Sequence, residues 1–129
     1  MSKVTVTTKR EFDVPDSDIV VLLEMAGYGI AYWASSMSVR DRKVTILEQE
    51  GHSSDGPEEH VRTFEQLAEV LVKIGVGDEK YGSAYNDYAK AYLRDLDDPT
   101  EAEWAAGNID SDLADHVIQY AVFGELIYG

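Results

Sequence analysis

The chain has 129 residues, 44% hydrophobic and 28% charged, and its 25 Asp and Glu outnumber 11 Lys and Arg to give a formal net charge of −14. This length and composition fit one folded domain, and the negative charge disfavours direct binding to nucleic-acid phosphates or anionic membranes, whose binding proteins carry basic surfaces. The absence of cysteine excludes disulfides, thiolate metal sites and a Cys nucleophile.

From the N-terminus, the sequence predicts a strand followed by a long helix. Alternating β-branched residues predict a strand over residues 3–12 that ends before Pro15. Asp16 or Ser17 then caps a helix whose apolar residues recur at helical spacing as far as Ala34.

The middle of the chain predicts extended structure and a second helix. Residues 39–47 read as one bent strand or a short hairpin, and residues 51–59 read as a loop because they are rich in Gly, Ser and Asp. Another short strand is expected just before Thr63. Thr63 and Gln66 form the T-x-x-Q pattern of a capping box, so a helix begins there and ends at one of the next two glycines.

The last third predicts helices only. A third helix covers residues 82–96, and Pro99 suits the first turn of a short fourth helix. Asp110 or Ser111 caps a final helix, which Gly124 ends.

Together these elements predict a single α+β domain over residues 1–129. It combines a small antiparallel sheet of about three strands with about four to five helices. The N-terminus lacks the apolar core of a signal peptide, and no apolar run approaches the roughly 20 residues of a membrane span. We therefore expect a cytoplasmic protein with no membrane partner.

The charge is concentrated in the second half of the chain. Residues 1–64 hold 11 acids and 7 bases, whereas residues 65–129 hold 14 acids and 4 bases. The acidic helical region is assigned to residues 78–115. This concentration of negative charge favours a basic protein partner, although the charge can also serve solubility alone. The densest acids are Asp95, Asp97, Asp98, Glu101 and Glu103.

Four tyrosines give the sharpest pattern. If the third helix forms, they occupy one stripe at positions i, i+4, i+7 and i+11. The stripe either packs on the sheet or, rimmed by acids, anchors a basic partner. A homodimer interface is a further alternative. The tyrosines are Tyr81, Tyr85, Tyr88 and Tyr92, and the rim adds Asp87 to the densest acids.

No catalytic motif is present, and an enzyme is not expected. There is no GxSxG, P-loop or GxGxxG pattern, and no two histidines have the spacing of HExxH. Two histidines flank a loop whose acids could gather a metal, but chance clustering explains them better, so we predict no metal, no cofactor and no catalytic residue. These residues are His52, His60, Asp55, Glu58 and Glu59.

A second aromatic group suggests an alternative site for a ligand. Gly27 and Gly29 lie inside the first predicted helix, where each glycine costs roughly 1 kcal/mol relative to Ala. They indicate either close packing of another backbone or room for a nucleotide-like ligand stacked on Tyr32 and Trp33, with Tyr28 alongside.

The segments AGYGIAYWASS and DLADHVIQYAVFGELIYG resemble two stretches of small proteins encoded in bacteriophage genomes. Those proteins carry a Gly-Gly-x-x-Tyr-Trp helix and end soon after a Phe-Gly-Glu turn, found here at residues 123–125. This chain differs in having Ala26 before Gly27, and its acidic stretch at 78–108 has no counterpart. The resemblance implies a phage context and no catalytic residue.

By analogy with acidic phage accessory proteins, we predict an inhibitor that imitates nucleic acid. It would act in counter-defence or host takeover, as an anti-CRISPR or anti-restriction protein, by binding a basic nucleic-acid-handling host protein. The alternatives are a sponge for a nucleotide-like ligand and a homo-oligomeric structural protein.

Overall fold

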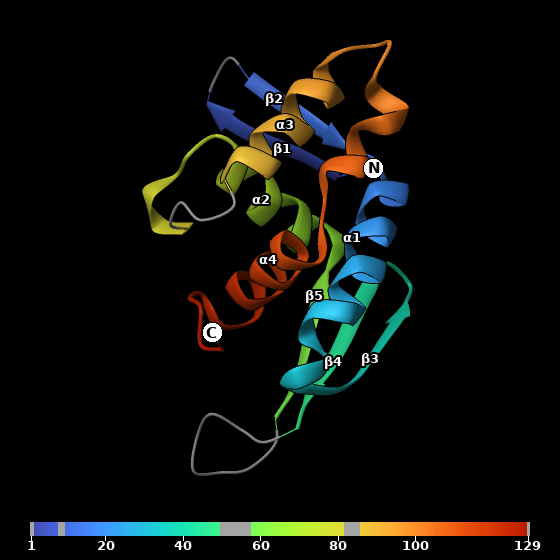
Figure 1. Cartoon of the computed structure of the whole chain (residues 1–129), viewed down its shortest axis with the longest axis vertical. Coiled ribbons are helices and arrows are strands. Elements are labelled where there is room, and N and C mark those ends of the chain that lie inside the picture. Colours follow the sequence, from blue (N-terminus) through green and yellow to red (C-terminus); the bar gives the residue numbers. More distant parts are fainter. Residues whose placement is uncertain (1, 8–9, 50–57, 82–85, 129) are drawn as a thin grey trace.

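The computed structural model describes residues 2–7, 10–49, 58–81 and 86–128, and it confirms the α+β class (Figure 1). Its strands form two antiparallel sheets, a pair β1–β2 and a triplet in the order β3–β4–β5. The strands are β1 (Ser2–Thr7), β2 (Arg10–Val14), β3 (Ala34–Arg40), β4 (Lys43–Glu48) and β5 (Glu59–Thr63). The α-helices are α1 (Asp16–Gly29), α2 (Phe64–Gly75), α3 (Asn86–Asp97) and α4 (Ser111–Phe123), and the 3-10 helices are η1 (Ile30–Tyr32), η2 (Glu79–Tyr81) and η3 (Ala102–Asn108).

The first predicted strand is in fact a hairpin. The chain reverses between β1 and β2, so that Val4 lies opposite Phe12. Both side chains are buried, because the alternating pattern continues on the same face after the reversal. The prediction of one strand over residues 3–12 is therefore wrong, whereas the predicted small antiparallel sheet of about three strands is present as β3–β4–β5, with the β1–β2 pair in addition.

The predicted hairpin around residues 39–47 and the strand before Thr63 are both present. Asp41 and Arg42 form the two-residue turn between β3 and β4, both with positive φ (54° and 59°). The Arg42 guanidinium donates to Asp16 at 2.8 and 2.9 Å and to Glu65, which ties the turn to the starts of α1 and α2. Most of the predicted loop, residues 50–57, lies outside the described residues.

The helix boundaries follow their capping chemistry. The capping box of Thr63 and Gln66 has both of its hydrogen bonds, and the Asp110 side chain accepts from the Leu113 amide at 2.7 Å. At α1 the prediction is wrong, because Pro15 precedes the first turn and no side chain caps it. That helix also ends before Ala34, which begins β3.

The third predicted helix is present over its described residues, and the short fourth helix is a 3-10 helix. The described part of the third helix, α3, begins at Asn86, and residues 82–85 are outside the described residues. Pro99 lies in a turn, and the short helix after it is a 3-10 helix that begins at Ala102.

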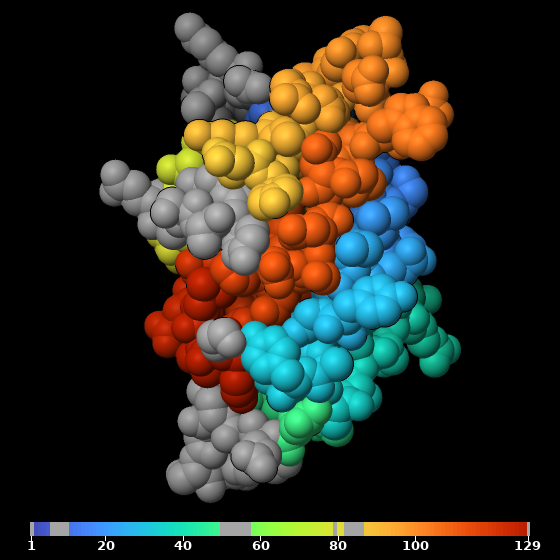
Figure 2. All heavy atoms as spheres, in the orientation of Figure 1, coloured from blue at the N-terminus to red at the C-terminus, as the bar shows by residue number. Residues whose placement is uncertain are grey.

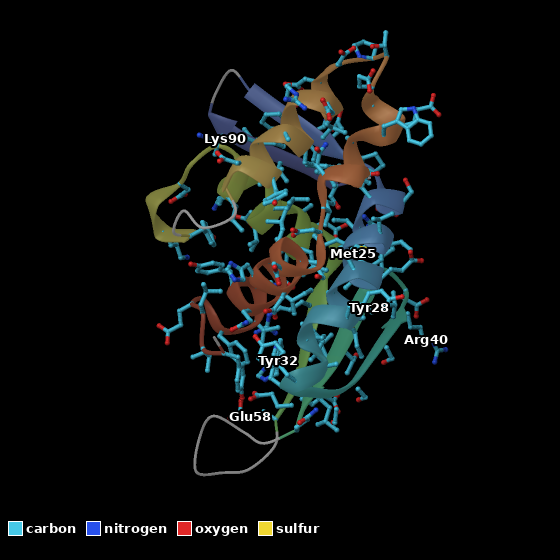
Figure 3. The ribbon with its side chains drawn as sticks, in the orientation of Figure 1. Met25, Tyr28, Tyr32, Arg40, Glu58 and Lys90 are labelled. Atoms are coloured by element: carbon cyan, nitrogen blue, oxygen red, sulfur yellow. The ribbon has the colours of Figure 1, made fainter. Side chains whose placement is uncertain are left out.

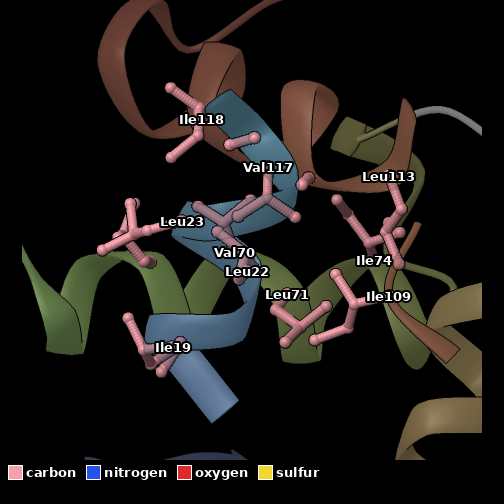
Figure 4. Close-up of a cluster of buried hydrophobic side chains, with 14 of the residues drawn as sticks. Ile19, Leu22, Leu23, Val70, Leu71, Ile74, Ile109, Leu113, Val117 and Ile118 are labelled. Carbon is pink, nitrogen blue, oxygen red and sulfur yellow. The ribbon is translucent and has the colours of Figure 1, made fainter. Parts of the chain in front are cut away.

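The core lies where α1, α2 and α4 pack against one another, and Figure 4 shows their side chains meeting there. α2 also contacts β1, α3 and β5, so it joins the two sheets and the acidic helical region. None of the helices in the described part of the chain is long and apolar enough to cross a membrane. The centre of the core includes Ile19, Leu22, Leu71, Leu113, Val117 and Ile118.

Candidate functional site: an acidic surface with an exposed tryptophan

Four exposed acids gather where α3 turns into η3, and we call Asp97, Asp98, Glu101 and Glu103 the acidic surface. Figure 2 shows this orange segment projecting at the upper end of the molecule. No Lys or Arg occurs between residues 95 and 104. These acids are neighbours in the sequence, and the structure places them together on a protruding, negatively charged edge.

The backbone holds this edge in consecutive tight turns. The Asp98 side chain accepts from both the amide (2.9 Å) and the hydroxyl (2.8 Å) of Thr100, and the Glu101 amide donates to the Asp98 carbonyl at 3.0 Å. The Trp104 amide then donates to the Glu101 carbonyl at 2.9 Å. The acids are therefore presented by ordered backbone, which lowers the entropy lost on binding.

Trp104 is the residue that sequence reasoning missed. Its side chain is 70% exposed, directly after Glu103, although tryptophan is usually well buried. Its neighbours Ala105 and Ala106 are buried, so η3 packs through its small residues and turns the indole outward. The available signal was a single large aromatic residue in a segment otherwise made of acids and small residues. An exposed tryptophan is typical of binding anchors.

Asp95 has a structural role that the sequence did not reveal. It accepts from Arg94 Nε at 3.0 Å and from Asn108 Nδ2 at 2.8 Å, which fastens the end of α3 to η3. The hydrogen bond from Arg94 holds the pKa of Asp95 below its ordinary value. Asp95 supports the acidic surface, and its carboxylate is already engaged within the protein.

The sequence left two alternatives open for the tyrosine stripe, packing within the fold and exposure to a partner, and the structure buries two of the four tyrosines. Tyr92 is fully buried and donates its hydroxyl to Asp18 at 2.7 Å, and Tyr81 is also buried, in η2 outside the third helix. Tyr88 is 47% exposed, and Tyr85 lies outside the described residues. The role in partner binding is therefore wrong for Tyr81 and Tyr92, because Tyr81 packs edge-on against Tyr120 of α4 and Tyr92 packs against α1 through Asp18.

Asp87 is exposed in the first turn of α3, a whole helix away from the acidic surface. Tyr88 follows it and is the one described tyrosine of the stripe that is markedly exposed. Lys90 and Arg94 lie between this end of α3 and the acidic surface. A partner bound to the acidic surface would reach Asp87 and Tyr88 only if it also lay along the whole of α3.

The alternative ligand site is closed by the C-terminal segment. Trp33 is only 2% exposed, and its Nε1 donates to Asp115 at 3.0 Å. The Tyr128 ring stacks on the Trp33 ring, with ring centroids 5.2 Å apart and an interplanar angle of 5°. A ligand cannot stack on an indole face that another ring already covers. The prediction of Trp33 as a stacking platform is wrong.

The other residues of that alternative have structural explanations or face solvent. A Cβ on Gly29 would lie 2.8 Å from the Ser111 carbonyl, so the close approach of α4 requires this glycine. Tyr28 is 82% exposed, and a Cβ on Gly27 would meet no atom outside its own helix backbone closer than the Met37 side chain at 4.0 Å. The hollow lined by Tyr32 measures ≈ 90 Å³, small beside the roughly 300–1,000 Å³ of ligand pockets.

The Tyr32 side chain is 52% exposed, but its hydroxyl joins the same hydrogen-bond network as Trp33. Its hydroxyl donates to Asp115 at 3.0 Å, and Gln119 donates to that carboxylate at 3.2 Å. Burial, followed by the charge of Asp115, raises the pKa of Tyr32 to about 12. These contacts hold the C-terminal segment on the fold, and they account for the aromatic motif without a ligand.

No protein-family model, curated protein sequence or solved structure matches this chain. Neither a relative nor a structural neighbour therefore bears on the acidic surface, and its function is inferred from its residues. The phage resemblance rests on the short motifs at residues 26–36 and 112–129.

Proposed function

We propose that this protein binds a basic, nucleic-acid-handling protein through the acidic surface, with Trp104 as the anchor, and so keeps nucleic acid away from it. The observation that carries the proposal is the 70% exposed indole beside four exposed acids in a stretch with no Lys or Arg. Surfaces that recognise basic partners combine such an aromatic anchor with complementary charge.

The two parts of the surface would contribute differently. The acids would steer a positively charged partner and raise the association rate, an effect that salt screens. The indole would enter an apolar or cationic pocket of the partner and slow dissociation, since truncating a central tryptophan typically costs about 2 kcal/mol or more. Both are needed for a specific complex.

The resemblance to phage-encoded proteins supports an inhibitory role. A projecting row of carboxylates can occupy the Lys and Arg side chains with which an enzyme holds phosphates. The proposed targets are therefore a CRISPR effector, a restriction enzyme or another host enzyme of nucleic acids, in the host cytoplasm.

The test is capture of host proteins from a bacterial lysate on the immobilised full chain. It is run at about 0.1 M and about 1 M salt, where the Debye length falls from about 10 Å to about 3 Å. We expect a basic nucleic-acid-binding protein to be retained at low salt and lost at high salt. Trp104→Ala should reduce its retention at least about tenfold.

A matched pair of triple variants separates this surface from net charge. Asp97→Lys/Glu101→Lys/Glu103→Lys alters the acidic surface, and Glu24→Lys/Glu59→Lys/Glu125→Lys makes the same charge change at exposed acids elsewhere. The first should abolish retention and the second should preserve it. Equal retention by both, or capture that is insensitive to salt, contradicts the proposal. Self-association on the matrix would favour the homo-oligomer instead.

A further inference from the structure

Three potential metal ligands lie on one face of the β4–β5 hairpin. Side chains of β4 alternate, so that Val44, Ile46 and Glu48 point to the core. The Glu48 amide donates to the Glu58 carbonyl at 3.0 Å, which places Glu58 opposite Glu48, and His60 follows two residues later on the same face. The pleat and the register bring the three together.

Their functional atoms are close enough to share one ion. His60 Nε2 lies 2.6 Å from Glu48 Oε1 and 3.9 Å from Glu58 Oε2, and one ligand atom from each of the three residues lies within 4.8 Å of the other two. The side chains are 0% exposed for Glu48, 10% for His60 and 38% for Glu58. The cluster is therefore a buried group that opens to solvent on the Glu58 side.

Besides the hydrogen bonds that His60 and Tyr128 make to Glu48, a cation would offset the negative charge of the two carboxylates. Two carboxylates opposite each other across a ladder repel, and burying one of them costs several kcal/mol unless it is compensated. A divalent ion bound at about 2.0–2.2 Å to each ligand separates tetrahedral ligand atoms by roughly 3.3 Å, between the two distances observed here. Small side-chain rotations would satisfy that geometry.

We propose that Glu48, Glu58 and His60 bind a divalent transition-metal ion, with Zn²⁺ the best match to one imidazole and two carboxylates. The sequence analysis named His60 and Glu58 among possible ligands but predicted no metal, because Glu48 lies in the preceding strand and only the strand register brings it beside them. This site is independent of the acidic surface. Figure 3 places Glu58 at the lower end of the molecule.

The neighbouring groups orient the ligands. The Tyr128 hydroxyl donates to Glu48 Oε2 at 2.6 Å, and the Phe123 ring meets the His60 ring edge-on at 5.3 Å. Such outer contacts fix the orientation of metal ligands and usually matter about 10–100-fold in affinity. Three protein ligands also leave a coordination position for water.

The experiment is calorimetric titration of the chelator-treated full chain with Zn²⁺, followed by Mn²⁺ and Mg²⁺, together with the melting temperature in each ion. Wild type should bind one Zn²⁺ per chain and gain thermal stability. Glu58→Gln should weaken binding about tenfold or more. Glu59→Gln, the same change at the next residue on the opposite face of β5, should bind as wild type does.

Glu58 is the ligand to alter first because it is the most exposed of the three, so the variant is expected to fold, which circular dichroism checks. His60→Gln gives a second loss of binding at a different ligand type. The proposal is overturned if wild type binds neither Zn²⁺ nor Mn²⁺, whether or not it binds Mg²⁺. It is also overturned if Glu58→Gln and Glu59→Gln bind alike, because binding would then belong to scattered acids.

Discussion

The two tryptophans of this chain occupy opposite environments. Trp33 is buried under Tyr128 and bonded to Asp115, whereas Trp104 is 70% exposed beside carboxylates. The first is part of the core, and the second is exposed at an energetic cost that binding could recover. Because only Trp104 is exposed to solvent, its surroundings can be measured by fluorescence quenching without any partner.

Quenching of tryptophan fluorescence should reveal the charge around Trp104. We expect caesium to quench it about twofold or more better than iodide at low salt, because the acids attract the cation and repel the anion. Added salt should remove the difference. Trp104→Phe should abolish most quenching, whereas Trp33→Phe should leave it intact. Equal quenching by the two ions would show that the indole lies outside the acidic field.

At the same scale, the sequence could predict which residue types matter but not which of them are exposed. The spacing of Tyr88 and Tyr92 is compatible with one stripe, yet only the packing of α1 shows that Tyr92 bonds to Asp18. Trp104 carried no periodic signal because a 3-10 turn has three residues per turn and η3 is short. Side-chain exposure depends on contacts that are distant in sequence.

Among the elements, α1 and α4 approach each other closely at Gly29. A Cβ on Gly29 would lie 2.8 Å from the Ser111 carbonyl oxygen and 3.1 Å from the Asp115 Cβ. These contacts are too short, so the backbone of α1 or α4 would have to shift. Gly27, on the same helix, is exposed and has no such contact. The two glycines of one motif therefore have different reasons to be present.

Alanine substitution should separate these two glycines. Gly29→Ala should lower the free energy of unfolding by about 1–3 kcal/mol, because α4 must move away. Gly27→Ala should raise it by about 0.5–1 kcal/mol, because alanine restricts the unfolded chain and suits the helix. Chemical denaturation of both variants measures this, and equal effects would refute the assigned contact.

The contact between α1 and α3 predicts a pH dependence. Burial raises the pKa of Asp18 above its ordinary value of 3.8, although the hydrogen bond from Tyr92 opposes this. The contribution of Asp18 to stability is thus fully present below its ordinary pKa and is lost as the pH rises through its folded-state pKa.

Asp18→Asn keeps an acceptor for Tyr92 and cannot ionise. The stability of wild type relative to this variant should therefore fall as the pH rises above the ordinary Asp pKa of 3.8, as measured by melting temperature from acidic to neutral pH. A constant difference, or one that grows with pH, would show that ionised Asp18 carries no burial cost.

Element types were better predicted than element boundaries. Capping patterns are local, so Thr63 with Gln66 and Asp110 marked their helices correctly. Alternation is compatible with one strand or two, so the β1–β2 hairpin was missed. The Glu48, Glu58 and His60 cluster depends on strand register, which a single sequence does not specify.

On the scale of the whole molecule, the two proposed sites lie at opposite ends of the longest axis. The acidic surface projects at one end, and the β4–β5 hairpin with Glu58 lies at the other (Figures 1 and 3). The core of α1, α2 and α4 separates them. A partner on the acidic surface would therefore leave the hairpin uncovered.

The most direct test of the account is competition with nucleic acid on the captured host protein. That protein is first saturated with labelled DNA or RNA and then titrated with the wild-type chain at low salt. We predict that wild type releases the nucleic acid and that Asp97→Lys/Glu101→Lys/Glu103→Lys does not. A stable ternary complex, in which the nucleic acid stays bound while the wild-type chain occupies the host protein, would contradict the account.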